Sequence, residues 1–194
     1  MKIVTAVAYS EVHDAYLRDH PVERAHEANS NVYGEENLER ADRMPGGWWR
    51  VRLSRADVLG VVLPWHLSEG GEFELVPRTG LTVGEAAARV RSGGAAWTAA
   101  NPVCAAKLKL LRRAPFTPLF LSSAPVDHSD YGELSARAGL IHLDGLHRML
   151  AWELAGRLPA RAVLDGYLVG DAGLPGGRLP TRGARAGRAG DESA

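Results

Sequence analysis

Hydrophobic and polar positions divide the chain into short strands and helices. Partial alternation of apolar and polar side chains is typical of half-buried strands, and short apolar runs are typical of strands covered on both faces. Glycine and proline separate most of these stretches, as they do at turns. The predicted strands cover residues 2–8, 48–53, 60–63, 73–77, 119–121, 139–143 and 161–169.

Capping residues mark where the predicted helices begin. Ser10, Ser54 and Asn101 each stand where a cap is needed, and the last is followed by a proline suited to a first helical position. Thr82 and Glu85 have the spacing of a capping box. The predicted helices cover residues 11–19, 55–59, 82–92 (ending at Gly93-Gly94), 102–113 and 146–155, with two short helices inside residues 22–44.

This mixture of elements predicts an α+β fold in which helices flank a small mixed sheet. The 194 residues suit one domain, which we place at residues 1–169. From residue 170 onward Gly, Pro, Arg and Ala follow one another without periodicity. We therefore interpret residues 170–194 as a disordered tail.

Charge and composition exclude several classes of protein. Lys and Arg (23) balance Asp and Glu (23), so the net charge gives no support to a general nucleic-acid-binding role. No stretch is apolar enough for a membrane helix, so we expect a cytoplasmic protein without a membrane partner. The single cysteine excludes an internal disulfide and any zinc site with two or more thiolates. The strong preference for Arg over Lys is typical of a GC-rich genome, such as an actinobacterial one.

The turn before the last predicted helix has the clearest chemical signature. Asp144 and Gly145 form the turn, and the helix begins with Leu146, His147 and Arg148. Unpaired N–H groups and the positive end of the helix dipole favour an anion at such a place, above all a phosphate. We expect Arg148 to point to solvent or ligand, and Asp144 to hold Mg²⁺ or accept a substrate proton. An ordinary capped turn with surface residues remains the alternative.

These five residues resemble the Asp-Gly-x-His-Arg turn of the ParB/sulfiredoxin-like superfamily. Residues 114–121 resemble an earlier strand of that superfamily, which is reached through a proline, and residues 158–169 resemble its closing strand. The resemblance covers residues 107–169, about a third of the chain. Residues 1–100 are then a lineage-specific part of the same domain.

The resemblance implies nucleotide chemistry, because the superfamily binds nucleotide phosphates at this turn. It implies that Gly145, Leu146, His147 and Arg148 bind phosphate, and that Asp144 and His147 act in catalysis, with Asp144 also holding Mg²⁺. Sulfiredoxins place a catalytic cysteine where this chain has Leu146, and partition proteins place a glutamate there. The sequence is therefore nearer to the free amino-acid kinases of the superfamily.

We therefore expect a nucleotide-binding enzyme of small-molecule metabolism, a kinase-like phosphotransferase that would suit a specialised biosynthesis. It would use ATP or another nucleotide with Mg²⁺ to transfer a phosphoryl group or to activate a substrate. A non-catalytic nucleotide-binding regulatory module is the alternative. A nucleic-acid-binding protein, with a basic face around Lys107, Lys109, Arg112 and Arg113, is less favoured. The acceptor, the nucleotide base and the oligomeric state stay open.

Other side chains give weaker signals. Asp127, His128 and Asp130 precede the motif strand and are candidates for a loop that closes over a substrate. His66, after Pro64-Trp65, is a candidate for a ligand-contacting wall, although packing is favoured. Cys104 lies in a first helical turn that can lower a thiol pKa, yet a small buried residue is the favoured interpretation. Three histidines near the amino terminus could meet on helix faces with two glutamates, where a solvated face is favoured: His13, His20 and His26, with Glu23 and Glu27.

Overall fold

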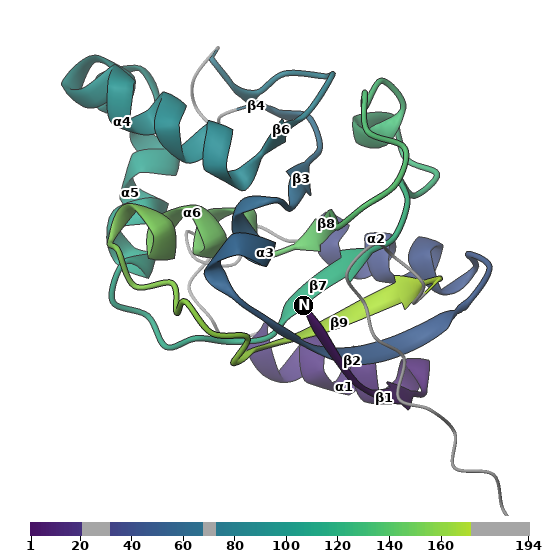
Figure 1. Cartoon of the computed structure of the whole chain (residues 1–194). Coiled ribbons are helices and arrows are strands. Elements are labelled where there is room, and N and C mark those ends of the chain that lie inside the picture. The colour runs from purple at the N-terminus through teal and green to yellow at the C-terminus, as the bar shows by residue number, and fades with distance from the viewer. Residues whose placement is uncertain (21–31, 68–72, 172–194) are drawn as a thin grey trace, which may run out of the picture.

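The computed structural model describes residues 1–20, 32–67 and 73–171 (Figure 1). The strands are β1 (Lys2–Val7), β2 (Gly47–Leu53), β3 (Val62–Leu63), β4 (His66–Leu67), β5 (Glu74–Val76), β6 (Leu81–Thr82), β7 (Leu119–Ser122), β8 (Ile141–Asp144) and β9 (Leu164–Gly170). The helices are α1 (Tyr9–Asp19), α2 (Val32–Asp42), α3 (Arg55–Leu59), α4 (Val83–Ala100), α5 (Pro102–Leu111) and α6 (Leu146–Leu154), with a 3₁₀ turn at Ser129–Tyr131. The predicted α+β fold is confirmed.

Seven of the described strands form one mixed sheet in the order β1-β2-β9-β7-β8-β3-β6. Strand β2 lies antiparallel between β1 and β9, whereas β7 is parallel to β9 and antiparallel to β8. Strand β3 continues the sheet parallel to β8. Strands from the first hundred residues therefore lie on both sides of the strands that carry the predicted motif, and the two parts of the sequence share one sheet.

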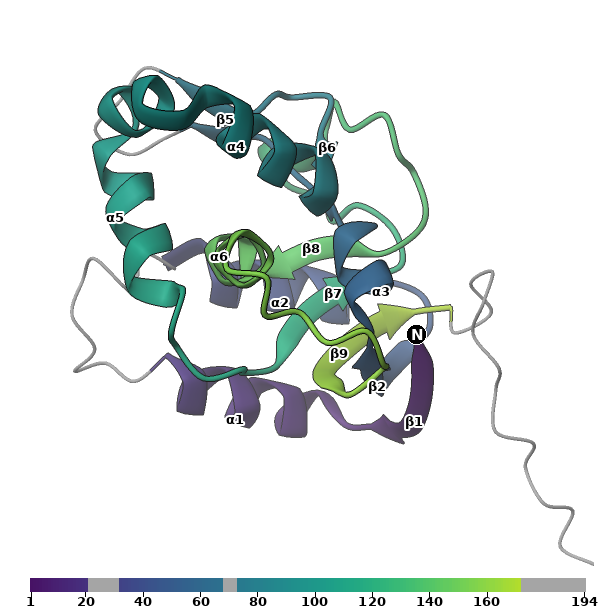
Figure 2. The same ribbon diagram turned by 60° about the vertical axis from the view of Figure 1, so that its left-hand side comes forward.

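Helices cover both faces of this sheet, and side chains that alternate along the strands supply a core to each face. On β7, Leu119 and Leu121 pack with the core under α3 to α6, whereas Phe120 packs with the core under α1 and α2. On β9, Leu168 joins the first core and Tyr167 the second. Figure 2 shows α1 on one side of the sheet and α4, α5 and α6 on the other.

The predicted capping box of Thr82 and Glu85 is confirmed, and so is the predicted cap at Ser54, which forms a second capping box with Asp57. The predicted cap at Ser10 is wrong, because α1 begins one residue earlier and Ser10 lies inside it. Asn101 takes the predicted cap position before Pro102, but its side chain makes no capping hydrogen bond. Its amide instead donates to the carbonyl of Trp97 in the preceding helix (2.9 Å), which ties α4 to the start of α5.

Two predicted boundaries shift for reasons of backbone geometry. Gly94 breaks α4 with a positive φ of 50°, as the glycine pair predicts, but helical backbone resumes beyond it as far as Ala100. Gly170 pairs with Gly47 at the end of β9, so it belongs to the sheet and not to the predicted tail. Residues 172–194 lie outside the described residues. No helix in the described ranges has the length and apolar character needed to cross a membrane.

A buried carboxylate joins three helices on one face of the sheet. Glu153 of α6 is 4% exposed and accepts hydrogen bonds from Arg55 of α3 (2.9 and 2.7 Å) and from Arg91 of α4 (2.8 Å). Hydrogen bonds from Arg55 hold the pKa of Glu153 below its ordinary value, and those from Arg91 add to the effect. The ionised form of Glu153 is therefore part of the folded structure.

We expect Glu153→Gln to lower the free energy of unfolding at pH 7 by about 1–3 kcal/mol, the range for hydrogen bonds to a charged group. Because the folded pKa of Glu153 is depressed, the contribution of its charge is present above the unfolded pKa and is lost as the pH falls through the folded pKa. Urea denaturation at several pH values should show the two proteins converging below about pH 4. A difference that does not change with pH would contradict this role of the charge.

Candidate functional site

The junction of β8 and α6 has the turn that the sequence predicts. Gly145 precedes α6 with φ 107° and ψ 15°, in the left-handed region that favours glycine. A Cβ atom at this position would lie 2.8 Å from Cδ2 of the buried Leu119 and 3.3 Å from Nη2 of Arg148. Gly145 therefore serves both the backbone conformation and the close packing of the site.

The guanidinium of Arg148 is buried among acceptors, and the expectation that it points to solvent is wrong. Arg148 is 8% exposed and donates to the carboxylates of Asp19 and Asp144 and to the hydroxyl of Thr117. Both carboxylates are buried as well. Burial lowers the pKa of Arg148 to about 10, so the guanidinium is still charged at neutral pH. Ionised carboxylates paired with a charged guanidinium explain how these groups are accommodated away from water.

His20 adds a fourth polar group to this cluster. Its ring stacks on Tyr16 (centroids 4.2 Å apart), and its Nδ1 lies 3.0 Å from the Tyr16 carbonyl, which can only accept a proton. Nε2 of His20 lies 3.6 Å from Oδ2 of Asp144. One ligand atom each from Asp19, His20 and Asp144 lie within 4.8 Å of one another.

The side chain of His142 accepts a hydrogen bond from the first backbone N–H group of α6. Its Nε2 accepts a hydrogen bond from the N–H of Leu146 (3.0 Å). Burial, with a smaller contribution from the nearby His66, lowers the pKa of His142 to about 3, so the ring is neutral. With Nε2 accepting, the proton of the neutral ring lies on Nδ1, which is buried without a hydrogen-bond partner among the described residues. The N–H of Leu146, predicted to bind phosphate, is therefore already paired.

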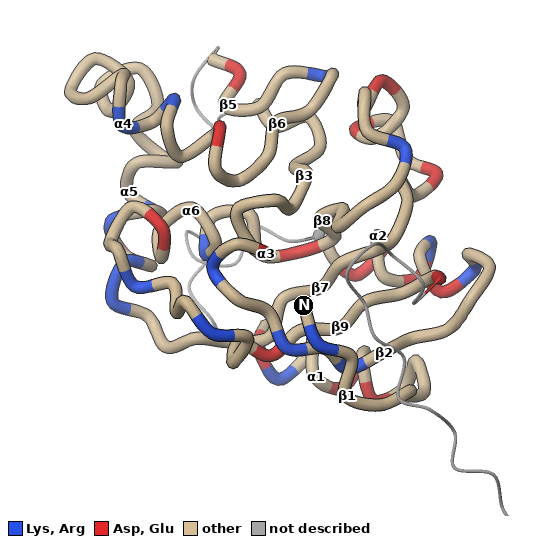
Figure 3. Tube along the Cα trace, viewed as in Figure 1, with Lys and Arg blue, Asp and Glu red and all other residues tan. Residues whose placement is uncertain are grey.

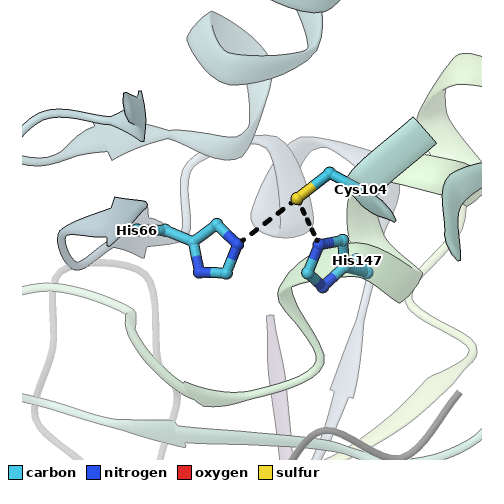
Figure 4. A group of neighbouring side chains, drawn as sticks. All are labelled: His66, Cys104 and His147. Atoms are coloured by element: carbon cyan, nitrogen blue, oxygen red, sulfur yellow. Dashed lines mark hydrogen bonds between the residues drawn. The ribbon is translucent and has the colours of Figure 1, made fainter. Parts of the chain in front are cut away.

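A second cluster lies at the same helix start and contains His147 (Figure 4). Nε2 of His147 lies 3.4 Å from Sγ of Cys104, and Sγ lies 3.7 Å from Nε2 of His66. The three residues come from α6, α5 and β4. Burial holds the pKa of His147 well below its ordinary value, and the nearby His66 and Lys107 act in the same direction, so the His147 ring is neutral near pH 7. The structure thus divides the predicted motif, with Asp144 and Arg148 in one cluster and His147 in the other.

Hydrogen bonds within the protein hold the predicted substrate loop, residues 127–130, in place. The carbonyl of Asp127 accepts from Arg40 of α2 (2.6 Å), and the ring of His128 accepts from the N–H of Asp130 (3.2 Å). Tyr131, which follows, donates from its hydroxyl to the carbonyl of His142 (2.9 Å). These contacts attach the loop to α2 and to β8. A direct role of Asp127, His128 or Asp130 toward a substrate stays a prediction.

Two other expectations change with the fold. Lys107, placed in a basic face by the sequence analysis, is 4% exposed and lies close enough to His147 to affect its pKa. Basic and acidic positions are otherwise interspersed along the described chain (Figure 3). Of the histidines near the amino terminus, His13 contacts Glu35 (2.7 Å) and His20 contacts Asp144. His26, Glu23 and Glu27 lie outside the described residues.

Sequence reasoning missed Asp19, Thr117 and His142 as parts of the site. Asp19 sits at the end of a polar helix and Thr117 in a loop between prolines, and neither position carries a motif. His142 stands in the motif strand between Ile141 and Leu143, where the alternation of apolar and polar residues could have assigned it to the face opposite theirs. Cys104 and His66 were noticed separately, but nothing in their spacing connects them.

Fold and site together define an α+β protein with two clusters of side chains of the types that can ligate a metal, both at the start of one helix. The chain belongs to the DUF6309 family, a family of unknown function, whose model matches residues 1–188. Neither the curated proteins nor the solved structures give a match. The ParB/sulfiredoxin-like resemblance and its nucleotide chemistry therefore stay predictions.

We expect Arg148→Met to lower the free energy of unfolding by about 3–5 kcal/mol, because it leaves two buried carboxylates without their counter-charge. Arg52→Met is the control, since Arg52 pairs with Asp165 where both side chains are nearly half exposed, and should cost less than about 1 kcal/mol. Adding Asp19→Asn to Arg148→Met should restore part of the stability in urea denaturation. Equal, small losses in Arg148→Met and Arg52→Met would contradict the buried cluster.

Gly145→Ala should destabilise the fold more than Gly156→Ala. Both glycines have positive φ (107° and 67°), but a Cβ at Gly156 meets nothing within 4 Å. We expect about 1 kcal/mol for Gly156→Ala and about 2–3 kcal/mol for Gly145→Ala, which adds the contact with Leu119 to the backbone strain. Thermal melting of the two variants side by side measures the difference, and equal shifts would show that the space beside Gly145 is not restricted.

Proposed function

We propose that this protein is a nucleotide-dependent enzyme that transfers a phosphoryl group from ATP, or another nucleotide, to a small molecule with the help of Mg²⁺. The proposal is carried by one observation: the carboxylates of Asp19 and Asp144 converge on the guanidinium of Arg148 beside the glycine turn. Carboxylates that can hold a cation and a guanidinium that can hold phosphate are the groups that phosphoryl transfer requires.

The two carboxylates fit a magnesium ion. Mg²⁺ prefers oxygen ligands, and it usually takes one or two carboxylates together with substrate phosphates and water. Asp19 and Asp144 come from α1 and β8, and their ligand atoms lie within 4.8 Å of each other and of His20. Two carboxylates and one guanidinium leave an excess negative charge, which a cation would compensate.

The same cluster fits a phosphate only after an exchange of partners. Arg148 already donates to Asp19, Asp144 and Thr117, so a phosphate has to replace a carboxylate on the guanidinium. A divalent cation that attracts the two carboxylates makes the guanidinium available and removes their repulsion toward phosphate. Binding of the nucleotide is therefore expected to depend strongly on Mg²⁺.

In the proposed reaction an acceptor hydroxyl attacks the terminal phosphorus, the bond to the nucleoside diphosphate breaks, and the hydroxyl proton is released. Arg148 neutralises charge on the phosphoryl oxygens, while Asp19 and Asp144 hold the bound Mg²⁺, which neutralises the rest. His20 is the candidate to take the proton, because its Nε2 lies 3.6 Å from Oδ2 of Asp144, beside the carboxylates that would hold Mg²⁺. A contact of His147 with phosphate stays a prediction, because His147 contacts Cys104.

A non-catalytic nucleotide-binding module is the second candidate. It is favoured by the donors that are already paired, since the N–H of Leu146 and the guanidinium of Arg148 both have partners within the fold. Such a module would bind a nucleotide without transferring its phosphoryl group. Nucleotide binding and ADP release with a panel of small hydroxyl compounds therefore have to be measured separately.

We expect calorimetry to detect ATP binding in Mg²⁺ and at least tenfold weaker binding in EDTA, about 1.4 kcal/mol. Asp19→Asn and Asp144→Asn should each abolish this Mg²⁺ dependence, and binding in EDTA should tighten because Arg148 loses a competing carboxylate. Turnover should be lost in both variants. Asp165→Asn, at an exposed carboxylate on β9, is the matched control and should leave all values unchanged.

The outcomes separate the candidates. Binding of ATP, CTP or ADP without ADP release from ATP would support the regulatory module. Absence of binding for all three nucleotides, or a Mg²⁺ dependence that is the same in both variants and in the unmodified protein, would refute the proposed site.

A further inference from the structure

We propose that His66, Cys104 and His147 form a binding site for a single Zn²⁺ ion. Each residue comes from a different element: His66 from β4, Cys104 from the first turn of α5 and His147 from the first turn of α6 (Figure 4). One ligand atom from each lies within 4.8 Å of the other two. The site differs from the Asp19–Asp144–Arg148 cluster and does not depend on the proposed nucleotide chemistry.

The distances match the edges of a zinc coordination tetrahedron. Zn–S bonds of about 2.3 Å and Zn–N bonds of about 2.0–2.1 Å place sulfur and nitrogen ligands about 3.6 Å apart at a tetrahedral angle. Nε2 of His66 and of His147 lie 3.7 and 3.4 Å from Sγ of Cys104. The two imidazole rings meet at 79° with their centroids 5.1 Å apart, so they approach the sulfur from different directions. No large rearrangement is needed for all three atoms to contact one ion.

The donor set selects a transition metal of zinc type. Thiolate and imidazole are soft or borderline ligands, which favour Zn²⁺ over Mg²⁺, whereas the carboxylates of the other cluster favour the reverse. A single cysteine cannot build a structural zinc site with several thiolates, but the proposed site needs only one thiolate beside two imidazoles. Three protein ligands leave one tetrahedral position, which is the pattern of zinc sites that also bind water or a substrate.

Neighbouring groups hold the ligands in place. Cys104 lies on α5 three residues after Asn101, whose side chain is bonded to the end of α4, so the helix start is fixed. His147 lies on a helix whose first N–H is capped by His142. Lys107 is buried on α5, three residues beyond Cys104. A thiolate and Zn²⁺ together carry one positive charge, so with Lys107 beside them the fourth position favours an anionic ligand such as hydroxide or a carboxylate.

The test uses the full chain, without nucleotide, so that its outcome is separate from that of the magnesium site. Zinc affinity is measured by competition with a chromogenic chelator, and the metal content by mass spectrometry. We expect one Zn²⁺ per chain and a loss of affinity of more than about 100-fold in Cys104→Ser and in His66→Gln. Mutating a residue that only hydrogen-bonds to a zinc ligand typically lowers metal affinity about 10–100-fold, so loss of a ligand should cost more. His13→Gln, at a half-buried histidine on α1 that contacts Glu35, is the control and should bind zinc normally.

Cobalt provides a second measurement that reports the ligand itself. The chain has one cysteine, so a sulfur-to-cobalt charge-transfer band can arise only from Cys104. We expect this band in the Co²⁺ form of the unmodified protein, its displacement by one equivalent of Zn²⁺, and its absence in Cys104→Ser. His66→Gln keeps the thiol, so it tests the site even if Cys104→Ser does not fold. Zinc bound at less than about a tenth of an equivalent, zinc affinity unchanged in His66→Gln, or a cobalt spectrum without the thiolate band would overturn the proposal.

Discussion

The buried guanidinium of Arg148 determines how the parts of this protein come together. Asp19 and Arg148 are 129 residues apart, yet each needs the other, because a charge away from water is costly unless it is paired. Asp144 stands at the end of β8 and Thr117 just before β7, so the same guanidinium connects α1, the entry to β7 and the β8–α6 turn. The surrounding helices and strands have to be arranged so that these acceptors meet, and the site follows from that arrangement.

Helix α6 is fixed at both ends, so it can hold functional side chains in defined positions. At its start, His142 accepts a hydrogen bond from the first N–H group, and Gly145 permits the close approach of Leu119. At its end, Glu153 binds arginines from α3 and α4. Side chains on its first turn therefore have few alternative positions, and preorganised groups bind and stabilise charge better than mobile ones.

Adjacent residues on that first turn lead to two different kinds of chemistry. Successive side chains on a helix point about 100° apart, so His147 and Arg148 face different neighbours. Arg148 meets carboxylates, which suit a hard cation and a phosphate, and His147 meets a thiol and a second imidazole, which suit a zinc-type ion. The two proposed sites share a helix start but suit different ions, so each can be tested without the other.

The sequence alone determined the α+β class, most strands and helices, the cap at Ser54, the capping box at Thr82 and the glycine turn before α6, because these depend on residues close together in the chain. It singled out Asp144, Gly145 and Arg148, but it placed Arg148 toward solvent. Only the tertiary structure decided that Asp19 pairs with Arg148, that His142 occupies the first N–H of α6, and that Cys104 lies between His66 and His147. The contact of His142 with Leu146 spans only four residues. The others join residues far apart in sequence, and no local periodicity or spacing encodes which distant side chain will face another when both are buried.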